Sequence, residues 1–217
     1  MGNNAIVTGG TRGIGKATSS LLKVAGYNVL SADTAMGDLS TNEGIDKLVE
    51  SIDFDVDVLI NNAAYTKFIS PAFSMDMLSD EIFDKVFMVN VKAPFKLVKK
   101  LSPRFTKNAC IINIASVAGI TGNGSNMAYC ASKAALINMT KFMARQLAPI
   151  RVNSVSPGLI KTDFVKFPEH YYDDTVKKTP VARMGQPEDV ARVVVGLIDS
   201  NYITGENIVV DGGRSLN

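Results

Sequence analysis

Residues 4–15 read N-A-I-V-T-G-G-T-R-G-I-G, a short apolar run that leads into a turn with four glycines. The apolar run predicts a buried strand at 4–7, and residues 16–25 predict a helix that Gly26 ends. A glycine turn between a strand and a helix suits a diphosphate, because glycine lets the backbone approach and the helix start supplies free N–H groups. The alternative for this G-x-x-x-G-x-G spacing is a turn that packs closely for structural reasons.

The alternation of strand and helix continues along the chain. Further strands are predicted at 27–33, 57–60, 111–115, 151–155 and 207–210. A helix is predicted from about 43 to 52, behind a capping box at 40–43, and another from 79 to 101 with a break near Pro94. A third contains residues 129–133 and continues to about 147, and a fourth runs from 187 to 199. The sequence therefore predicts an α/β fold with a doubly wound, Rossmann-like parallel sheet in a single domain, residues 1–217.

The connection after the second predicted strand is short. Only residues 34–37 separate Asp33 from Asp38, whereas a helical crossover between parallel strands needs at least about ten residues. We therefore expect six main strands, with the strand that ends at Asp33 at one edge of the sheet. An acid in that place suits the ribose hydroxyls of an adenosine, and Asp38 and Leu39 are then expected to fold over the adenine pocket. An aspartate that only starts a turn is the alternative for Asp33.

Two segments lack a regular pattern. Residues 65–77 predict a loop, and residues 162–180 carry apolar and aromatic side chains among charges with no clean period. We interpret the second segment as a mobile lid, where the choice of substrate is made.

Residues 116–133 read S-V-A-G-I-T-G-N-G-S-N-M-A-Y-C-A-S-K and place Tyr129 four residues before Lys133. On a helix these two side chains share one face, and a cation within about 4–6 Å lowers the pKa of a phenol by roughly 1–3 units. Such a phenol gives and takes protons near neutral pH. Ser116 follows the predicted strand at 111–115, which brings its hydroxyl to the carboxyl end of the sheet. The alternative for a tyrosine and a lysine at this spacing is a pair on the helix surface with no catalytic role.

Asn90 stands inside the predicted helix 79–101, among Phe87, Met88, Val89 and Val91. Its amide is expected to be buried and therefore hydrogen-bonded. This residue could either hold neighbouring segments together or take part in the functional site, and both interpretations stay open.

Composition excludes several classes of protein. The chain has 217 residues, the size of one large α/β domain, and a net charge of +2, which argues against nucleic-acid binding. Cys110 and Cys130 form no disulfide framework or metal cluster, and a zinc site at the single histidine, His170, would need an unusual ligand set. No signal peptide or membrane-spanning run is recognised, so we expect a cytoplasmic protein with no membrane partner.

Together these motifs resemble the short-chain dehydrogenase/reductase family in its compact form. The resemblance rests on T-G-G-T-R-G-I-G at 8–15, N-N-A-A at 61–64, Asn90, Ser116, Y-C-A-S-K at 129–133 and P-G-L-I-K-T at 157–162, in the family's order. G-Q-P-E-D-V-A at 185–191 and I-T-G-E-N-I-V-V-D-G-G at 203–213 are similar to β-ketoacyl-acyl-carrier-protein reductases. Two departures are the missing helix and third strand after Asp33 and the alanine at position 64.

The resemblance implies catalytic roles for four residues. Tyr129 would be the general acid in carbonyl reduction and the base in alcohol oxidation, and Lys133 would lower its pKa and hold the nicotinamide ribose. Ser116 would hydrogen-bond the substrate oxygen, and Asn90 would position a water that relays protons to Lys133. The resemblance also implies a set of cofactor-binding residues: Gly9, Thr11, Arg12, Gly13, Ile14, Gly15, Asp33, Asp38, Leu39, Asn61, Ala63, Tyr129, Lys133, Pro157, Gly158, Ile160 and Thr162.

The expected cofactor is NAD, with NADP as the alternative. Arg12 is the kind of cation that meets the 2′-phosphate of NADP, whereas Asp33 binds a free 2′-hydroxyl and repels that phosphate. We give Asp33 more weight, because a long arginine side chain can turn into solvent at little cost.

The expected activity is hydride transfer between a nicotinamide and a carbonyl or secondary alcohol, with a 3-oxoacyl thioester as one candidate substrate. An alcohol, sugar or steroid dehydrogenase is an alternative, and a non-catalytic dinucleotide-binding protein is a second one. By analogy with the family we expect a homo-oligomer, a tetramer or a dimer, with the helices that carry Asn90 and Tyr129 at the interface.

Overall fold

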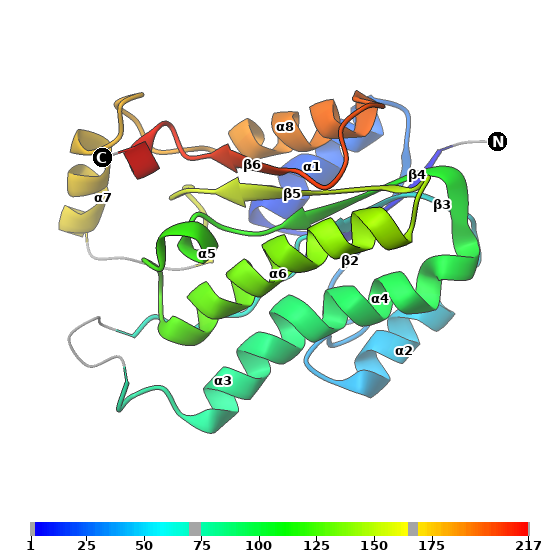
Figure 1. Ribbon diagram of the computed structural model, residues 1–217, viewed down its shortest axis with the longest axis horizontal. Helices are drawn as coiled ribbons and strands as arrows, with labels where there is room; N and C mark the ends of the chain where they lie inside the picture. Colours follow the sequence, from blue (N-terminus) through cyan, green and yellow to red (C-terminus); the bar gives the residue numbers. More distant parts are fainter. Residues whose placement is uncertain (1–2, 70–74, 165–168, 217) are drawn as a thin grey trace.

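The centre of the molecule is one parallel sheet of six strands. The computed structural model describes residues 3–69, 75–164 and 169–216, with the backbone alone for 169–171. The strand order is β2-β1-β3-β4-β5-β6 (Figure 1). The strands are β1 (Asn4–Thr8), β2 (Asn28–Ala32), β3 (Val56–Asn61), β4 (Phe105–Ile114), β5 (Arg151–Pro157) and β6 (Asn207–Val210). The predicted parallel sheet is confirmed, and so is the edge position of β2, which pairs with β1 alone among the described strands.

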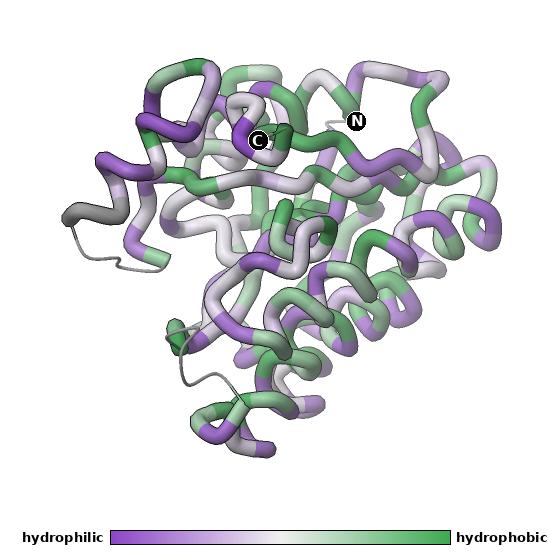
Figure 2. Tube along the Cα trace, turned by 60° about the vertical axis from the view of Figure 1, so that its left-hand side comes forward, coloured by the Kyte–Doolittle hydropathy of each residue, from purple (hydrophilic) through white to green (hydrophobic). Residues whose placement is uncertain are grey.

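Helices cover both faces of the sheet (Figure 1). They are α1 (Gly13–Val24), α2 (Asn42–Glu50), α3 (Asp80–Phe87), α4 (Ala93–Leu101), the short α5 (Ala118–Thr121), α6 (Met127–Gln146), α7 (Glu169–Lys177) and α8 (Pro187–Asp199). In Figure 2, hydrophobic and hydrophilic residues alternate along the helices, in keeping with one side on the sheet and one toward solvent. Among the described helices, none is both long and apolar enough to cross a membrane.

Alternate side chains of each strand feed two separate cores. Ile6 of β1 and Ile111 of β4 belong to the core beneath α2, α4 and α6, together with Leu97. Their neighbours Val7 and Ile112 belong to the core beneath α1 and α8. Successive side chains of a strand point to opposite faces, so a sheet covered on both sides needs the nearly continuous apolar strands seen in the sequence.

The predicted helix 79–101 is continuous but changes character midway. After α3 comes a π-helical turn, Met88–Lys92, and α4 begins at Ala93. In an α-helix the N–H of residue 94 would bond to the carbonyl of Asn90, and Pro94 has no N–H to donate. The predicted break near Pro94 is therefore a widened turn that contains Asn90.

The segment after β2 contains no further strand among the described residues. Asp33 closes a turn, with its Oδ1 accepting a hydrogen bond from the N–H of Ala35 at 3.0 Å. Leu39 is buried in the core beneath α2. The cap of α2 is Thr41 rather than Ser40, because the Thr41 hydroxyl accepts the N–H of Gly44 at 3.0 Å.

Two helices were not expected from the sequence. One is α5, a single turn. The other is α7, which lies within the predicted lid at 162–180. Residues 165–168 of that lid and residues 70–74 of the predicted loop lie outside the described residues.

Candidate functional site

The candidate site is a cavity of about 1290 Å³ at the carboxyl edge of the sheet. Its walls come from the segments that follow all six strands, because the carboxyl ends of parallel strands meet at one edge. Most of the predicted site residues line it: Gly9, Thr11, Arg12, Gly13, Ile14, Asp33, Asp38, Leu39, Ala63, Ser116, Tyr129, Lys133, Pro157, Gly158, Ile160 and Thr162. Three predicted residues, Gly15, Asn61 and Asn90, are not among its lining.

The glycine turn presents backbone to this cavity. Gly9 and Gly13 have φ angles of +63° and +51°, in the left-handed region that favours glycine. Helix α1 starts at Gly13 with no acidic side chain in its first turn, and the exposed Arg12 precedes it. Gly15 has a packing role instead, since a Cβ there would lie 2.2 Å from the carbonyl oxygen of Gly9. The turn thus offers the free N–H groups of a helix start to an anion in the cavity.

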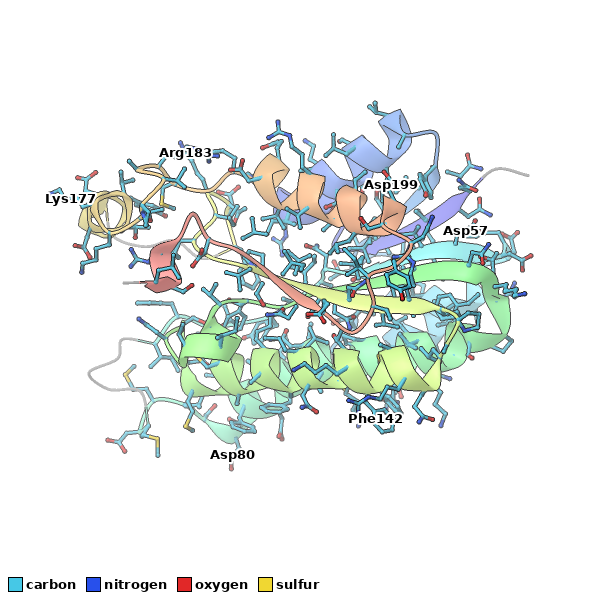
Figure 3. All side chains as sticks on the ribbon, turned by 45° about the horizontal axis from the view of Figure 1, so that its top comes forward. Asp57, Asp80, Phe142, Lys177, Arg183 and Asp199 are labelled. Atoms are coloured by element: carbon cyan, nitrogen blue, oxygen red, sulfur yellow. The ribbon has the colours of Figure 1, made fainter. Side chains whose placement is uncertain are left out.

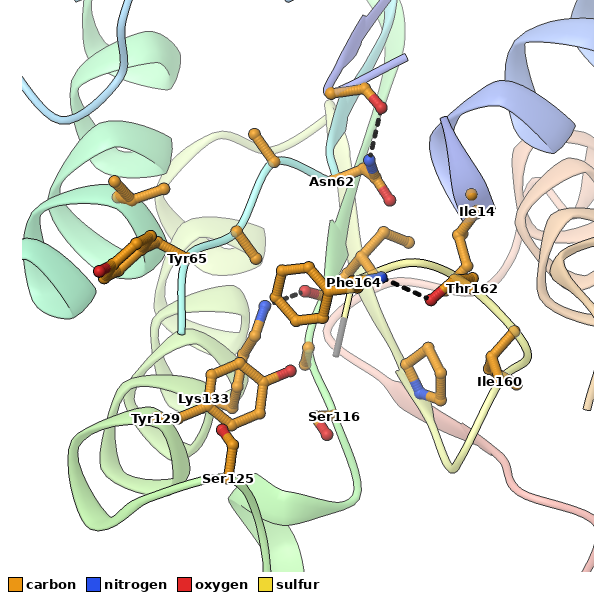
Figure 4. A pocket seen from close by; sticks show the side chains of 18 of the residues that line it. Ile14, Asn62, Tyr65, Ser116, Ser125, Tyr129, Lys133, Ile160, Thr162 and Phe164 are labelled. Atoms are coloured by element: carbon orange, nitrogen blue, oxygen red, sulfur yellow. Dashed lines mark hydrogen bonds between the residues drawn. The ribbon is translucent and has the colours of Figure 1, made fainter. Parts of the chain in front are cut away.

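At the end of β3, two neighbouring asparagines point in different directions. Asn61 points into the protein interior, where its Nδ2 donates to Oδ1 of Asn113 at 2.8 Å. Its neighbour Asn62 lines the cavity and donates to the carbonyls of Thr8 at 2.9 Å and Gly9 at 3.2 Å. Asn62 therefore fixes the glycine turn to β3 (Figure 4). The strand period of two could have shown that only one of two adjacent asparagines faces the cavity.

The adenosine end predicted for the cavity carries two acids. Asp33 is half-buried and Asp38 is exposed. Hydrogen bonds from the backbone and side chain of Ser40 hold the pKa of Asp38 below its ordinary value, and the charge of Lys85 on α3 adds to this. Lys85 also places its Nζ 4.7 Å from the ring centroid of Tyr65, and both residues line the cavity.

Ser116, Tyr129 and Lys133 meet at the other end of the cavity (Figure 4). Tyr129 and Lys133 share one face of α6 as predicted, with Lys133 Nζ at 5.6 Å from the centroid of the tyrosine ring. The Lys133 side chain is 2% exposed, and its Nζ donates to the carbonyl of Ile114 at 2.7 Å. Ser116 accepts the N–H of Ala118 at 3.1 Å, which turns its hydroxyl into the cavity.

The protonation of this pair differs from the prediction. Burial raises the pKa of Tyr129 to about 12, and a hydrogen bond with the side chain of Ser116 acts in the opposite direction. Burial lowers the pKa of Lys133 to about 7. The expected lowering of the tyrosine pKa by Lys133 is therefore wrong for this structure. Desolvation of the phenolate outweighs the hydrogen bond with Ser116, and Lys133, itself disfavoured as a cation by burial, does not lower the tyrosine pKa.

Asn90 is buried and acts as a brace. Its Oδ1 accepts the N–H of Tyr65 at 2.8 Å, and its Nδ2 donates to the carbonyl of Tyr65 at 3.0 Å. The same Nδ2 donates to the hydroxyl of Ser132 at 3.0 Å, and that hydroxyl donates to the carbonyl of Tyr129 at 2.8 Å. The side chain thus ties the segment after β3 to the helix that carries Tyr129.

A second set of polar contacts joins two loops at the mouth of the cavity. The hydroxyls of Thr66 and Ser125 lie 2.5 Å apart, and Asn126 donates to the carbonyl of Lys67 at 2.7 Å. Asn126 also caps α6, since its Oδ1 accepts the N–H of Tyr129 at 2.8 Å. Sequence reasoning missed these residues, although an asparagine just before a helix is a recognisable capping signal.

Comparisons with known proteins point to one family. The family profile described as Enoyl-(Acyl carrier protein) reductase matches residues 30–215. The 3-oxoacyl-[acyl-carrier-protein] reductase FabG of Thermotoga maritima is 35% identical over 244 aligned positions, which cover 98% of this chain and 97% of the relative. The chain belongs to the short-chain dehydrogenase/reductase family.

Solved structures of the family agree with this assignment. A 4-hydroxyisoleucine dehydrogenase complexed with NADH has a TM-score of 0.88 at 31% identity, with 99% of both chains covered. The angucycline C-6 ketoreductase LanV with bound NADP has a TM-score of 0.90 at 26% identity, covering 99% of this chain and 96% of that one. The chain is thus an NAD(P)-dependent reductase of the short-chain dehydrogenase/reductase family, which removes the non-catalytic alternative.

Proposed function

We propose that this enzyme reduces the keto group of a 3-oxoacyl thioester, with NADH as the preferred reductant and Tyr129 as the general acid. The observation that carries the proposal is the convergence of the Ser116 and Tyr129 hydroxyls on one end of the cavity, beside the buried Lys133. Two hydroxyl donors suit an oxygen that gains negative charge, as a ketone does when hydride reaches its carbon. The name of the Thermotoga maritima relative, 3-oxoacyl-[acyl-carrier-protein] reductase, supports the substrate class.

The raised pKa of Tyr129 fits the reductive direction. A phenol with a pKa of about 12 is protonated at neutral pH, so it is ready to give its proton to the developing alkoxide. Ser116 accepts from the backbone of Ala118, which leaves its own proton for a hydrogen bond to the same oxygen. Lys133 holds the end of β4 and lies on the same helix face as Tyr129, where it orients the phenol and would contact the nicotinamide ribose.

The residues of the cavity fit a dinucleotide. The glycine turn and the start of α1 would hold the diphosphate, and Asp33 would hold the adenosine ribose. Pro157, Gly158, Ile160 and Thr162, at the end of β5 and just after it, also line the cavity and would hold the nicotinamide end. When bound, the nicotinamide supplies the hydride, and the protein supplies orientation and the proton.

The sharpest test is a substrate panel with purified protein. We expect oxidation of NADH with the acetoacetyl thioester of N-acetylcysteamine and little with its crotonyl thioester. The enoyl thioester has no keto oxygen at the carbon that accepts hydride, so Tyr129 and Ser116 have nothing to protonate there. The alternatives of an alcohol, sugar or steroid dehydrogenase are tested by oxidation of cyclohexanol, a sugar alcohol and a hydroxysteroid with NAD. Turnover of the crotonyl thioester alone, or of alcohols alone, would contradict the proposed substrate class.

The predicted homo-oligomer remains part of this proposal. Phe95 on α4 and Phe142 on α6 are 47% and 62% exposed, and Figure 3 shows Phe142 on the outer side of its helix. Apolar side chains exposed on neighbouring helices suit a contact between copies of the chain. Sedimentation equilibrium should show a dimer or tetramer that Phe142→Glu weakens, and a monomer at all concentrations would contradict it.

A further inference from the structure

One aromatic side chain in the catalytic end of the cavity has no role yet. The ring of Phe164 lies 6.3 Å from the ring of Tyr129, centroid to centroid, with 48° between the ring planes. Figure 4 shows it reaching across the cavity from the Thr162 side toward Tyr129 and Lys133. Phe164 is 42% exposed and lines the cavity, so its free surface faces the space in front of the tyrosine.

The segment that carries Phe164 is anchored at its base. The N–H of Phe164 donates to the hydroxyl of Thr162 at 3.3 Å, and Lys161 donates its N–H to the carbonyl of Gly185 at 2.9 Å. Thr162 itself packs against the glycine turn, since a Cβ on Gly13 would lie 3.3 Å from the Thr162 Cγ2. The backbone just before the ring is therefore held by contacts with Gly185 and lies against the start of α1.

The opposite rim of this space is built differently. There the loop after β3 is tied to the loop before α6 through Thr66, Ser125 and Asn126. The segment before α6 gives small polar side chains to the cavity, Thr121, Asn123 and Ser125, whereas the loop after β3 adds the rings of Tyr65 and Phe68. A substrate in front of Tyr129 thus meets the small polar side chains of the segment before α6 on one side and, next to the tyrosine itself, the ring of Phe164.

We infer that Phe164 is a specificity-determining residue that limits the size of the substituent next to the reacting carbonyl. The inference rests on the proposed function, because it takes Tyr129 as the group that the carbonyl oxygen meets. The ring also covers the phenol, so it keeps water away from the proton donor. A flat or short apolar substituent fits against the ring, whereas a bulky one competes with it for the same space.

The test compares two thioesters of N-acetylcysteamine that differ only in the group beside the ketone, 3-oxobutanoyl and 3-oxo-3-phenylpropanoyl. Phe164→Ala should raise the ratio of kcat/KM for the phenyl substrate over the methyl substrate by about tenfold or more, in line with the gain from fitting a larger apolar group. Phe164→Trp should lower that ratio. Tyr202→Ala is the matched control, because Tyr202 is fully exposed and outside the cavity lining. An unchanged ratio in both Phe164 variants would overturn the inference.

A second measurement does not depend on turnover. Removing a ring that covers the phenol exposes it to water, so the pKa of Tyr129 should move from about 12 toward its ordinary value of 10.0. The ultraviolet difference between Phe164→Ala and the double variant Phe164→Ala/Tyr129→Phe isolates this tyrosine. If the native enzyme reduces neither thioester, the proposed function fails, and this titration alone tests whether the Phe164 ring shields the phenol of Tyr129. No movement of the tyrosine pKa would then refute the inference.

Discussion

The ammonium nitrogen of Lys133 donates a hydrogen bond to the carbonyl oxygen of Ile114 across 2.7 Å. Ile114 is the last residue of β4, and Lys133 lies four residues after Tyr129 on α6. The bond therefore joins the end of the strand that leads to Ser116 with the helix that carries the tyrosine. Together with the buried bond from Asn113 of β4 to Thr140 of α6, it helps to fix the relative position of the two hydroxyls, so Lys133 has a structural role as well as a charge.

Replacing Tyr129 by phenylalanine should remove turnover without removing the cofactor. The ring and its packing remain, but the proton donor is lost, so kcat should fall by at least the roughly 100–10,000-fold typical of general acid–base catalysis. The dissociation constant of NADH, measured by fluorescence, should change little. Tyr202→Phe, the same change at a fully exposed tyrosine, should leave kcat as it is. Substantial turnover by Tyr129→Phe would mean that another group delivers the proton.

The buried lysine should make stability depend on pH. Its pKa is about 7 in the folded protein and 10.5 as its ordinary value. Between these values the unfolded chain binds the extra proton, so the free energy of unfolding should rise with pH, on the order of a few kcal/mol. Urea denaturation from pH 7 to pH 9 measures the slope below the ordinary pKa of cysteine, 9.0, because burial raises the pKa of Cys110 and gives an opposite slope above that value.

Two variants identify the source of that slope. Lys133→Met keeps an unbranched side chain but removes the titrating group, so the rise should shrink. Lys141→Met makes the same change at an exposed position of α6, and its slope should match that of the native protein. If Lys133→Met retains the full rise, the buried lysine is not its cause.

Cofactor preference should follow Asp33. This carboxylate is half-buried at the end of β2, whereas Arg12 is exposed at the glycine turn. Two like charges about 4 Å apart interact by roughly 4 kcal/mol at an effective dielectric near 20, so a 2′-phosphate beside Asp33 is disfavoured. The native enzyme should show a higher kcat/KM with NADH than with NADPH, and Asp33→Ser should weaken or reverse this preference. A native preference for NADPH would make Arg12 the deciding residue.

A pair of glycine-to-alanine changes should have opposite effects on stability. At Gly15 the new Cβ would lie 2.2 Å from the Gly9 carbonyl oxygen and 2.5 Å from Asn62 Nδ2, which forces the glycine turn to move. We expect a loss of about 1–3 kcal/mol together with weaker NADH binding. At Gly196, inside α8, nothing lies within 4 Å of the new Cβ, and alanine should stabilise the helix by about 0.5–1 kcal/mol. Thermal unfolding of both variants measures the contrast.

Local pattern was sufficient for the fold and for part of the candidate site. The apolar runs, the glycine turn and the four-residue gap after Asp33 predicted a parallel sheet with β2 at its edge, because each reflects a constraint that acts within a few residues. The spacing of Tyr129 and Lys133 placed both on one helix face for the same reason.

What the tertiary structure decided was which of two neighbouring residues faces the cavity and how each group is charged. Asn61 turns inward to Asn113, while Asn62 binds the glycine turn. The side-chain amide of Asn90 forms hydrogen bonds with the backbone of Tyr65. The sequence predicted a tyrosine with a lowered pKa, but burial raises it. Side-chain direction and desolvation depend on segments that are distant along the chain and adjacent in space, so no local pattern in the sequence contains them.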